Sequence, residues 1–381
     1  MSVKGLDAVL ENIEQARGLP NEHYISAEMY ALEREHVFFK SWSALAFEAD
    51  VPNPGDVYPV DFLGAPLLVV RERSGTINVF QNTCRHRGMI LVDEPKHLKG
   101  PIRCPYHSWC YDHGGALLRT PYVGGVDIDT HDAIKTDELS LFKVQSHVWH
   151  GTVFINVSGD APSFEEEHKD IILRWKEFDQ PFNVPSKSSM FSMSLNTNWK
   201  LAIENFCESY HLPWVHPELN IISPIEAHYN IDDSDGYSGQ GSLNYRQIQG
   251  NNGSKFPDFK AISDNWDTDS EYVSFFPNVL MGVHRDHAYS VIIMPKGPEK
   301  IEERVAMFYA EDLDDGWADM LAENARIWRD VFSEDIGVVE GMQKGRHGPM
   351  FDGGKFSPVM DGATHIFHKW VARKMLSLQD T

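Results

Sequence analysis

The chain has 381 residues, 42% of them hydrophobic, which is enough apolar material for two or three domains. Its formal charge of −22 argues against a nucleic-acid-binding surface, which needs a basic patch. No apolar run reaches the roughly 18 residues that span a bilayer, the charged N-terminus lacks a signal-peptide core, and cysteines number only four. We therefore expect a protein of the reducing cytoplasm.

The first predicted element is a helix over Ser26–Lys40, where apolar residues recur at helical spacing and the serine can cap the start. We assign it to an N-terminal helical segment, residues 1–41, that packs on a later domain. From residue 42 to residue 157, short apolar runs alternate with Gly, Pro and Asp turns, which predicts a compact β domain. The acidic stretch Ser158–Lys169 is typical of an exposed connection.

Residues 158–381 are predicted to form a second domain, of α+β class. Strand-like alternation or β-branched and aromatic enrichment occurs at Ser189–Leu195, Tyr272–Gly282, Ala288–Met294 and Arg304–Tyr309. Helical patterns occur at Trp199–Tyr210 and Trp317–Lys344, so we expect an antiparallel sheet that grips a helix. The segment Asp232–Asp269 is rich in Gly, Asn and Asp, which indicates a functional loop or a mobile lid.

Two cysteines and two histidines in the first domain form a C-x-H-x17-C-x2-H pattern: Cys84, His86, Cys104 and His107. Two thiolates could hold one iron of a [2Fe–2S] cluster while two imidazoles hold the other. A structural zinc site also uses Cys2His2 sets. On these four residues alone both interpretations stay open.

A second group of metal-ligating side chains lies in the second domain. Glu204, Glu208 and His211 are spaced at i, i+4 and i+7, so they share one face if the helix is regular. Pro213 should end that helix, and His216 then comes from a bent continuation. Two imidazoles on either side of such a break could converge on one metal. The alternative is that these are ordinary polar residues beside a core helix.

Both groups resemble the motifs of one protein family. The loops NTCRHRGM (82–89) and CPYHSWCYD (104–112) resemble the ligand loops CxHRG and CPYHxW of Rieske iron–sulfur proteins. The segment NWKLAIENFCESYHLPWVHPE (198–218) is similar to the catalytic motif of Rieske-type non-haem iron oxygenases. This resemblance implies that His211 and His216 bind a mononuclear iron.

The resemblance also implies an aspartate as the third iron ligand, on a late helix. The matching stretch, VFSEDIGVVEGMQKG (331–345), gives this role to Asp335. Two His and one carboxylate on one face of the metal leave the other face open for dioxygen and substrate. Glu334 and Asp312 are local rivals as ligands. Ser333, Glu334 and Asp335 could instead be a helix start, where acidic side chains are favoured.

The fold that the resemblance implies is an N-terminal Rieske [2Fe–2S] all-β domain followed by a C-terminal helix-grip catalytic domain with Fe(II). Family members receive electrons from NAD(P)H indirectly, through a flavin and iron–sulfur reductase or a ferredoxin. They generally form homotrimers in which the cluster of one subunit serves the iron of its neighbour. We predict that Glu208, three residues before His211, has a catalytic role and links that ligand to His107 of the partner subunit.

Glutamate at position 208, where aromatic-ring dioxygenases usually have aspartate, resembles the branch that contains the carnitine, choline and betaine monooxygenases. We therefore expect O2-dependent N-demethylation or C–N cleavage of a quaternary ammonium compound, held in an aromatic cage. Candidate cage residues are Tyr210, Trp214, Phe275 and Phe276. One alternative is a ring hydroxylase or O-demethylase of aromatic compounds. Another is an iron–sulfur electron-transfer protein without oxygenase activity.

Overall fold

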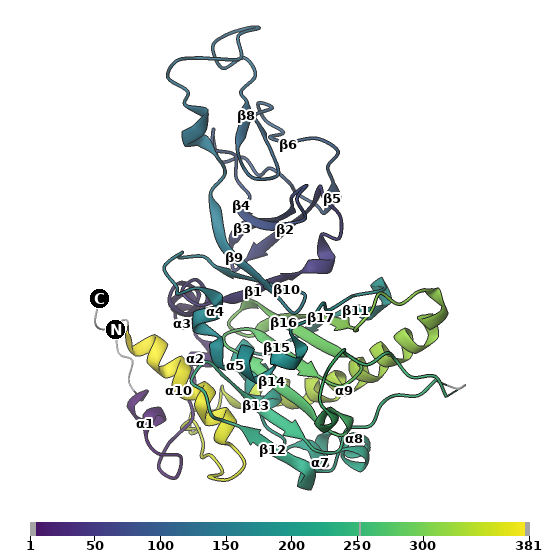
Figure 1. The fold of residues 1–381 in the computed structure, drawn as a ribbon. Helices are drawn as coiled ribbons and strands as arrows, with labels where there is room; N and C mark the ends of the chain where they lie inside the picture. The colour runs from purple at the N-terminus through teal and green to yellow at the C-terminus, as the bar shows by residue number, and fades with distance from the viewer. Residues whose placement is uncertain (1–4, 251–252, 378–381) are drawn as a thin grey trace. The chain divides into compact units, whose positions relative to one another are not determined.

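The computed structural model describes residues 5–250 and 253–377, which fold as two compact units (Figure 1). One unit is Ala44–Asp160. The other combines the N-terminal segment, up to Ser43, with the chain from Ala161 onward. Within the described ranges, no helix is both long enough and apolar enough to cross a membrane.

The Ala44–Asp160 unit is built mainly from β-strands. Its larger sheet has the order β1-β10-β9-β4-β3-β2-β5, and a smaller sheet has the order β6-β7-β8. The strands are β1 (Ser43–Phe47), β2 (Asp56–Phe62), β3 (Ala65–Arg71), β4 (Ile77–Gln81), β5 (Lys96–His97), β6 (Ile102–Arg103), β7 (Cys110–Tyr111), β8 (Leu117–Arg119), β9 (Lys143–Trp149) and β10 (Thr152–Asn156), with short helices η2 (Glu48–Asp50) and η3 (Thr136–Leu139). One buried apolar cluster joins strands of both sheets and includes Cys84 and Cys104, so the core anchors the loops that carry them.

The second unit has an antiparallel sheet of seven strands in the order β11-β17-β16-β15-β14-β13-β12. These strands are β11 (Met190–Leu195), β12 (His228–Ile231), β13 (Tyr237–Ser242), β14 (Ser270–Phe275), β15 (Val279–Val283), β16 (Ala288–Gly297) and β17 (Lys300–Phe308). Helices α6 (Trp199–Phe206), α9 (Ala318–Gly345) and α10 (Gly362–Leu376) pack against this sheet. The arrangement is the α+β helix-grip fold that the sequence predicts.

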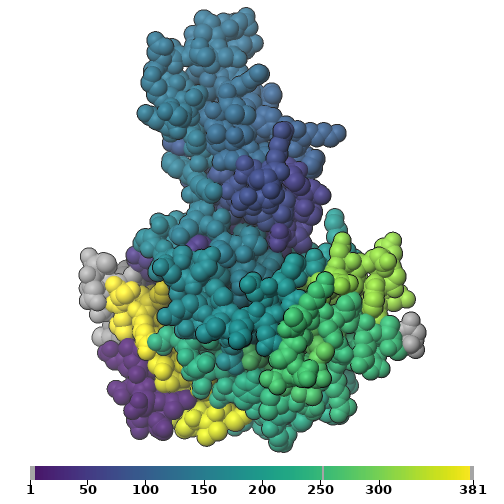
Figure 2. All heavy atoms as spheres, in the orientation of Figure 1, coloured from purple at the N-terminus to yellow at the C-terminus, as the bar shows by residue number. Residues whose placement is uncertain are grey.

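The shorter helices connect and cover these elements. They are α1 (Asp7–Leu10), α2 (Glu22–Ile25), α3 (Ala27–Glu33), η1 (Arg34–Phe38), α4 (Phe164–Glu167), α5 (Lys169–Arg174), η4 (Lys176–Phe178), η5 (Lys187–Ser189), α7 (Leu212–Val215), α8 (Pro217–Ile222), η6 (Ile225–Ala227), η7 (Asp264–Asp267) and η8 (Asp315–Trp317). Figure 2 shows the described part of the N-terminal segment, in purple, against α10, in yellow, which agrees with the contacts between α1 and α10.

Helix α3 and its π-helical continuation η1 confirm the helix predicted at the N-terminus. The Ser26 hydroxyl caps α3 by accepting the N–H of Met29 at 3.3 Å. A buried ion pair then ties this segment to α6, since Lys200 Nζ donates to Glu33 Oε1 at 2.7 Å. The indole N–H of Trp199 donates to the other oxygen of the same carboxylate at 2.8 Å. The N-terminal segment therefore fixes the start of the helix that leads into the second candidate site.

Two of the predicted long helices have different outcomes. The pattern at Trp317–Lys344 is confirmed by α9. The pattern at Trp199–Tyr210 is wrong at its end, because α6 stops at Phe206 and its last turn closes with the N–H of Cys207 on a carbonyl of the helix. Helix α10 was not predicted.

The strand predictions needed two corrections. The segment predicted as one strand, Tyr272–Gly282, is two strands, β14 and β15, because Pro277 lies in the turn between them and cannot donate to a ladder. Strand β13 lies inside the segment predicted as an irregular loop. Its sequence, YSGQGS, has one large apolar side chain, so it lacks the usual strand signal.

Close packing explains the small residues of β13. A Cβ atom on Gly239 would lie 2.0 Å from the carbonyl oxygen of Tyr272, and one on Gly241 would lie 2.1 Å from the ring of Tyr229. On the helix side, the Ser238 hydroxyl donates to the carbonyl of Ala363 in α10 at 2.8 Å. The glycines therefore allow β13 to lie close to its neighbours β14 and β12, where side chains would collide with them.

Substitution of Gly239 by alanine tests this packing. Because the clash is with backbone, we expect Gly239→Ala to lower the free energy of unfolding by about 3 kcal/mol, at the upper end of overpacking costs. Chemical denaturation of the holoenzyme measures it. Gly236→Ala is the matched control, since a Cβ there meets nothing within 4 Å. Equal stability of the two variants would contradict the packing argument.

Candidate metal centres and substrate cavity

The two loops of the first candidate site have the same backbone path. In each loop the N–H of the cysteine, Cys84 or Cys104, donates at 2.8 Å to the carbonyl five residues later. The N–H four residues after the cysteine returns to the cysteine carbonyl, at 2.9 Å in the first loop and 3.0 Å in the second. That fourth position has a left-handed backbone, Gly88 at φ +72° and Ser108 at φ +56°. The loops are therefore matched turns, each presenting its cysteine and histidine.

The predicted cluster ligands lie together in these turns. Cys84 and Cys104 are buried, and burial raises the pKa of the Cys84 thiol, with the nearby Cys104 thiol adding to the effect. The rings of His86 and His107 are 4.7 Å apart. The Nδ1 atom of His107 is buried and has no hydrogen-bond partner among the described residues. Two buried thiols, two adjacent imidazoles and an orphaned ring nitrogen fit the donor set of a His-ligated [2Fe–2S] cluster.

Two aromatic residues hold the donors in place. The ring of Trp109 stacks on His86 at 4.8 Å and 9°. The Tyr111 hydroxyl lies 3.3 Å from Cys84 Sγ and accepts the N–H of Arg85 at 3.0 Å. Because its oxygen already accepts this hydrogen bond, the Tyr111 hydroxyl can donate its own hydrogen to a thiolate at position 84. Hydrogen bonds to cluster sulfur are one of the means by which proteins tune the reduction potential.

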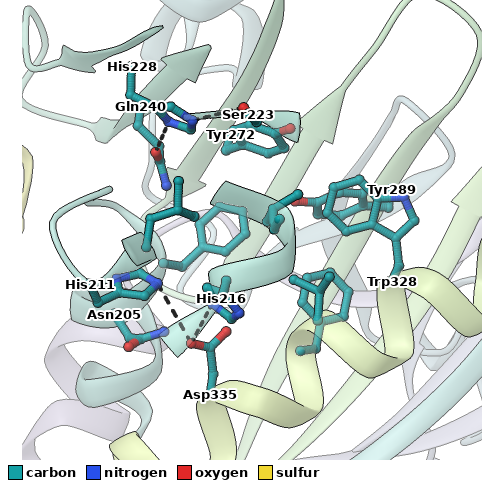
Figure 3. Close-up of a pocket in the computed structure, with 15 residues that line it drawn as sticks. Asn205, His211, His216, Ser223, His228, Gln240, Tyr272, Tyr289, Trp328 and Asp335 are labelled. Atoms are coloured by element: carbon teal, nitrogen blue, oxygen red, sulfur yellow. Dashed lines mark hydrogen bonds and ion pairs between the residues drawn. The ribbon is translucent and has the colours of Figure 1, made fainter. Parts of the chain in front are cut away.

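The second candidate site brings together the three residues predicted from sequence. His211 precedes α7, His216 lies between α7 and α8, and Asp335 lies on α9 (Figure 3). Asp335 Oδ1 lies 3.1 Å from Nε2 of His216 and 3.7 Å from Nε2 of His211. In the described part of the chain this is the one His, Cys, Asp or Glu group that could hold a single metal ion, with all ligand atoms within 4.8 Å of one another.

A carboxylate orients each histidine of this group. Glu208 Oε1 lies 2.6 Å from Nδ1 of His211, and Glu334 Oε2 lies 2.6 Å from Nδ1 of His216. Each Nδ1–H therefore donates to a carboxylate, which leaves each Nε2 lone pair toward Asp335. Burial lowers the pKa of His216, but Asp335 and Glu334 outweigh it, so the pKa is raised. The donor set fits a two-His, one-carboxylate iron site.

Several sequence interpretations around this site were wrong. Glu204 does not share a face with Glu208, because α6 ends between them. Its carboxylate is buried elsewhere and accepts the hydroxyl of Tyr24 at 2.5 Å. Asp335 lies well inside α9, so it is not part of a helix start. Of the two rival ligands, Glu334 contacts Nδ1 of His216, the ring nitrogen that does not face Asp335. Asp312 is exposed and lies outside the group.

A cavity opens beside the three candidate ligands, with about 510 Å³ of empty space that includes part of the open solvent (Figure 3). Aromatic rings from the sheet and from α9 form much of its wall, and Tyr289 and Trp328 lie 4.5 Å apart. No lysine or arginine lines it among the described residues. The residues that line it are Asn205, Phe206, His211, Leu212, His216, Leu219, Ser223, His228, Gln240, Tyr272, Tyr289, Trp328, Val331, Phe332 and Asp335.

The four aromatic residues suggested from sequence do not line this cavity. Tyr210 and Trp214 are exposed, and Phe275 and Phe276 are buried in the core on other aromatic rings. Sequence proximity to the histidines was a poor guide because α6 ends early and turns those side chains outward. Periodicity along α9 could have found Trp328, which lies two helical turns before Asp335 and so on the same face.

A second cavity adjoins the first. The two share five wall residues, which are Leu219, Ser223, Tyr272, Trp328 and Val331. The second cavity also has mostly apolar walls, with Arg246 as the one arginine or lysine among its described lining residues. A molecule that extends from the candidate metal site past Trp328 would therefore meet a positive charge.

Comparisons with known proteins match both parts of the chain. Residues 41–132 match the Rieske [2Fe–2S] domain, and residues 183–377, half of the chain, match the ring hydroxylating alpha subunit (catalytic domain). The carnitine monooxygenase oxygenase subunit of Escherichia coli (strain K12) is 25% identical, over 88% of this chain and 85% of the relative. The glycine betaine monooxygenase oxygenase subunit of Chromohalobacter salexigens is also 25% identical, over 98% and 90%.

A solved structure has the same fold. It is a quaternary ammonium Rieske monooxygenase, described for its carnitine oxidation and inter-subunit electron transfer, with a TM-score of 0.78, 20% identity and coverage of 97% of this chain and 98% of that chain. The family matches exclude a simple electron carrier, since the catalytic domain accompanies the cluster domain. The chain belongs to the ring-hydroxylating alpha subunits, the iron-dependent oxidoreductases that combine a Rieske [2Fe–2S] domain with a non-haem iron catalytic domain.

Proposed function

We propose that this oxygenase oxidises a quaternary ammonium compound of the betaine type, by N-demethylation or C–N cleavage. The observation that carries the proposal is the aromatic cavity beside the candidate iron ligands. A quaternary ammonium has no N–H to donate and is held best over the faces of Trp and Tyr rings. Tyr272, Tyr289 and Trp328 offer such faces, and no cationic lysine or arginine on the described wall would repel the ligand. The names of the two relatives support the same class.

A substrate with an anionic end fits the adjoining cavity. Arg246 lines that cavity together with Trp328, so a cationic head over the indole leaves a carboxylate free to reach the guanidinium. Arginine is well suited to carboxylates because its planar group donates two parallel hydrogen bonds. This favours zwitterions over simple cations such as choline.

The metal-ligand roles are part of the proposal. Cys84, His86, Cys104 and His107 would hold the [2Fe–2S] cluster, and the three candidate ligands around Asp335 would hold Fe(II). When bound, these centres supply electron storage and O2 activation, with electrons from NAD(P)H through a partner reductase. The chain itself fixes both histidine tautomers and excludes water with aromatic walls.

The expected reaction balances as a monooxygenation. Insertion of one oxygen atom into an N-methyl C–H bond consumes O2, two electrons and two protons and releases water. The N-hydroxymethyl product then breaks its C–N bond, which releases formaldehyde and a proton and leaves a tertiary amine. Cleavage of a longer N-substituent gives a larger aldehyde in the same way.

We also propose a homotrimer in which Glu208 connects two subunits. One carboxylate oxygen is committed to Nδ1 of His211 at 2.6 Å, and the other accepts backbone N–H groups of the same turn, from Tyr210 and His211. The carboxylate is thus held rigidly beside a candidate iron ligand. A contact from it to His107 of the partner subunit would give electrons a short path, in line with the inter-subunit transfer described for the structural relative.

An aromatic substrate is the second candidate, because aromatic walls also stack on aromatic rings and the matched catalytic family is named for ring hydroxylation. We expect formaldehyde release, measured with holoenzyme and a reductase, from glycine betaine or carnitine and not from benzoate or methoxybenzoate. Formaldehyde from methoxybenzoate alone would establish an O-demethylase. Hydroxylated benzoate without formaldehyde would establish a ring hydroxylase.

Substitution of Arg246 tests the anionic end of the substrate. We expect Arg246→Gln to raise KM for glycine betaine about tenfold, the effect of losing one charged hydrogen bond, with kcat little changed. KM for choline, which has no carboxylate, should stay the same. Equal effects on both substrates would contradict the assignment of Arg246.

Metal analysis tests the ligand assignments. Wild-type protein should contain about three iron atoms and two sulfides per chain, from one [2Fe–2S] cluster and one mononuclear site. His216→Ala should retain about two irons and both sulfides. His228→Ala is the matched control, since this histidine lines the same cavity without facing Asp335, and it should keep all three irons. Loss of sulfide in His216→Ala would contradict the assignment of two separate sites.

Substitution of Glu208 by glutamine tests the electron path. We expect Glu208→Gln to slow reoxidation of the reduced cluster by O2 and substrate about 10- to 100-fold, as measured in single-turnover absorbance, while keeping the mononuclear iron. Glu334→Gln is the matched control, because its contact with a histidine Nδ1 has the same 2.6 Å length. Glu334→Gln should weaken iron binding. In the fraction of this variant that keeps its mononuclear iron, the cluster should be reoxidised at the wild-type rate. Full turnover by Glu208→Gln would overturn the bridging role.

A further inference from the structure

A buried chain of hydrogen bonds lies behind the wall of the candidate substrate cavity. The indole N–H of Trp328 donates to Nε2 of His287 at 2.9 Å. On its other side, Nδ1 of His287 lies 2.9 Å from Asp286 Oδ1, which also accepts the hydroxyl of Tyr245 at 2.8 Å. Asp286 and His287 are both fully buried, in the turn between β15 and β16.

The donors and acceptors of this chain have one consistent assignment. An indole N–H can only donate, so Nε2 of His287 must accept. The imidazole is then neutral with its proton on Nδ1, and that proton is donated to the carboxylate of Asp286. His284 stacks on His287 at 4.2 Å, and burial holds the pKa of His284 well below its ordinary value, so it adds no positive charge. The hydrogen-bonded chain therefore runs from the indole of Trp328 through the imidazole of His287 to the carboxylate of Asp286.

Such an arrangement costs stability. The second oxygen of Asp286, Oδ2, is buried and has no hydrogen-bond partner among the described residues. Buried polar groups that are left unpaired are destabilising, and an apolar turn would have avoided the cost. Trp328 is the member of this hydrogen-bonded chain that lines the cavity beside the candidate iron ligands, whereas Tyr245 and His287 line the adjoining cavity. Toward a ligand in the cavity beside the candidate iron ligands, Asp286 and His287 would therefore act through the Trp328 indole.

We propose that Asp286 and His287 are positioning residues that present the face of Trp328 to the cationic head of the substrate. The inference rests on the proposed quaternary ammonium substrate and deepens it by naming the principal cation-binding wall. Figure 3 shows the Trp328 indole with its nitrogen on the side away from His211, His216 and Asp335.

The orientation of the ring decides whether it attracts or repels a cation. The face of an aromatic ring is electron-rich and its edge is positive, and an indole N–H is the most positive part of that edge. Turned toward the cavity, the N–H would repel an ammonium group and lack a partner. Held by His287, it points away, and the carboxylate behind it adds negative potential. Tyr289, 4.5 Å from the indole, then completes the wall.

A pair of isosteric ligands measures the attraction for charge alone. Glycine betaine and 3,3-dimethylbutanoate differ in the central atom of the head, which is N⁺ in the first and carbon in the second. We expect wild-type holoenzyme to bind glycine betaine about tenfold more tightly, as measured by calorimetry without reductant. In His287→Leu, which removes the acceptor, this ratio should fall to within about twofold while 3,3-dimethylbutanoate binds as before.

Two further variants separate positioning from a general loss of structure. His287→Gln can accept from the indole and donate to Asp286, so it should restore the ratio. Trp328→Phe has no N–H to hold, so adding His287→Leu in that background should not change the ratio further. The visible absorbance of the cluster and the melting temperature check that each variant is folded. If His287→Leu does not fold, the ratio in Asp286→Asn, expected to fall below half of the wild-type value, decides.

The outcomes for the two proposals are distinct. An unchanged ratio in folded His287→Leu, with formaldehyde still released from glycine betaine, overturns the inference alone. Equal binding of the two ligands by wild-type protein, with no formaldehyde from any quaternary ammonium compound, overturns the proposed substrate and this inference with it. A fall in the ratio that His287→Gln does not restore also overturns the positioning role.

Discussion

The geometry of the candidate iron site depends on which nitrogen each imidazole keeps free. His211 and His216 can both direct Nε2 toward Asp335 because Glu208 and Glu334 each occupy the opposite nitrogen at 2.6 Å. Without those carboxylates, either ring could flip or take the other tautomer, and the three ligand atoms would not stay together. The position of the candidate metal site is therefore set by two acids that lie outside the group of three candidate ligands.

A helix end and a strand with small side chains make this pairing possible. Helix α6 ends at Phe206, which frees the following turn to fold Glu208 back onto His211. Strand β13 is nearly free of large side chains, and Gln240 on it donates to the carbonyl of Glu208 at 3.1 Å. The sheet thus supports the turn from one side while α9 brings Asp335 from the other. If α6 had continued, this turn would have kept helical backbone hydrogen bonds, and the site would not have formed.

The sequence predicted the parts of the site that depend on spacing within a motif. Cys84, His86, Cys104 and His107, and the pair His211 and His216, were picked out as candidate metal ligands in this way, whereas their particular roles and Asp335 came from the family pattern. It did not predict Glu334 as an orienting group, because that role depends on helix α9 meeting α7 in space. The aromatic wall was missed for the same reason, since Tyr289 and Trp328 are 39 positions apart and meet only in the fold. Strand β13 was missed because its glycines are required by close contacts with neighbouring strands, which no local sequence pattern reveals.

Helix α9 carries both a wall residue of the cavity, Trp328, and a candidate metal ligand, Asp335. Trp328 and Asp335 are seven residues apart, so the helix sets them about 10.5 Å apart along its axis and on the same face. Inserting one residue between them would turn the indole about 100° away from the cavity. Along this helix, then, substrate range can change by exchanging side chains at positions such as Val331 and Phe332, but not by changing length. The helix therefore fixes the spacing between the Trp328 indole and the carboxylate of Asp335, which would hold the iron.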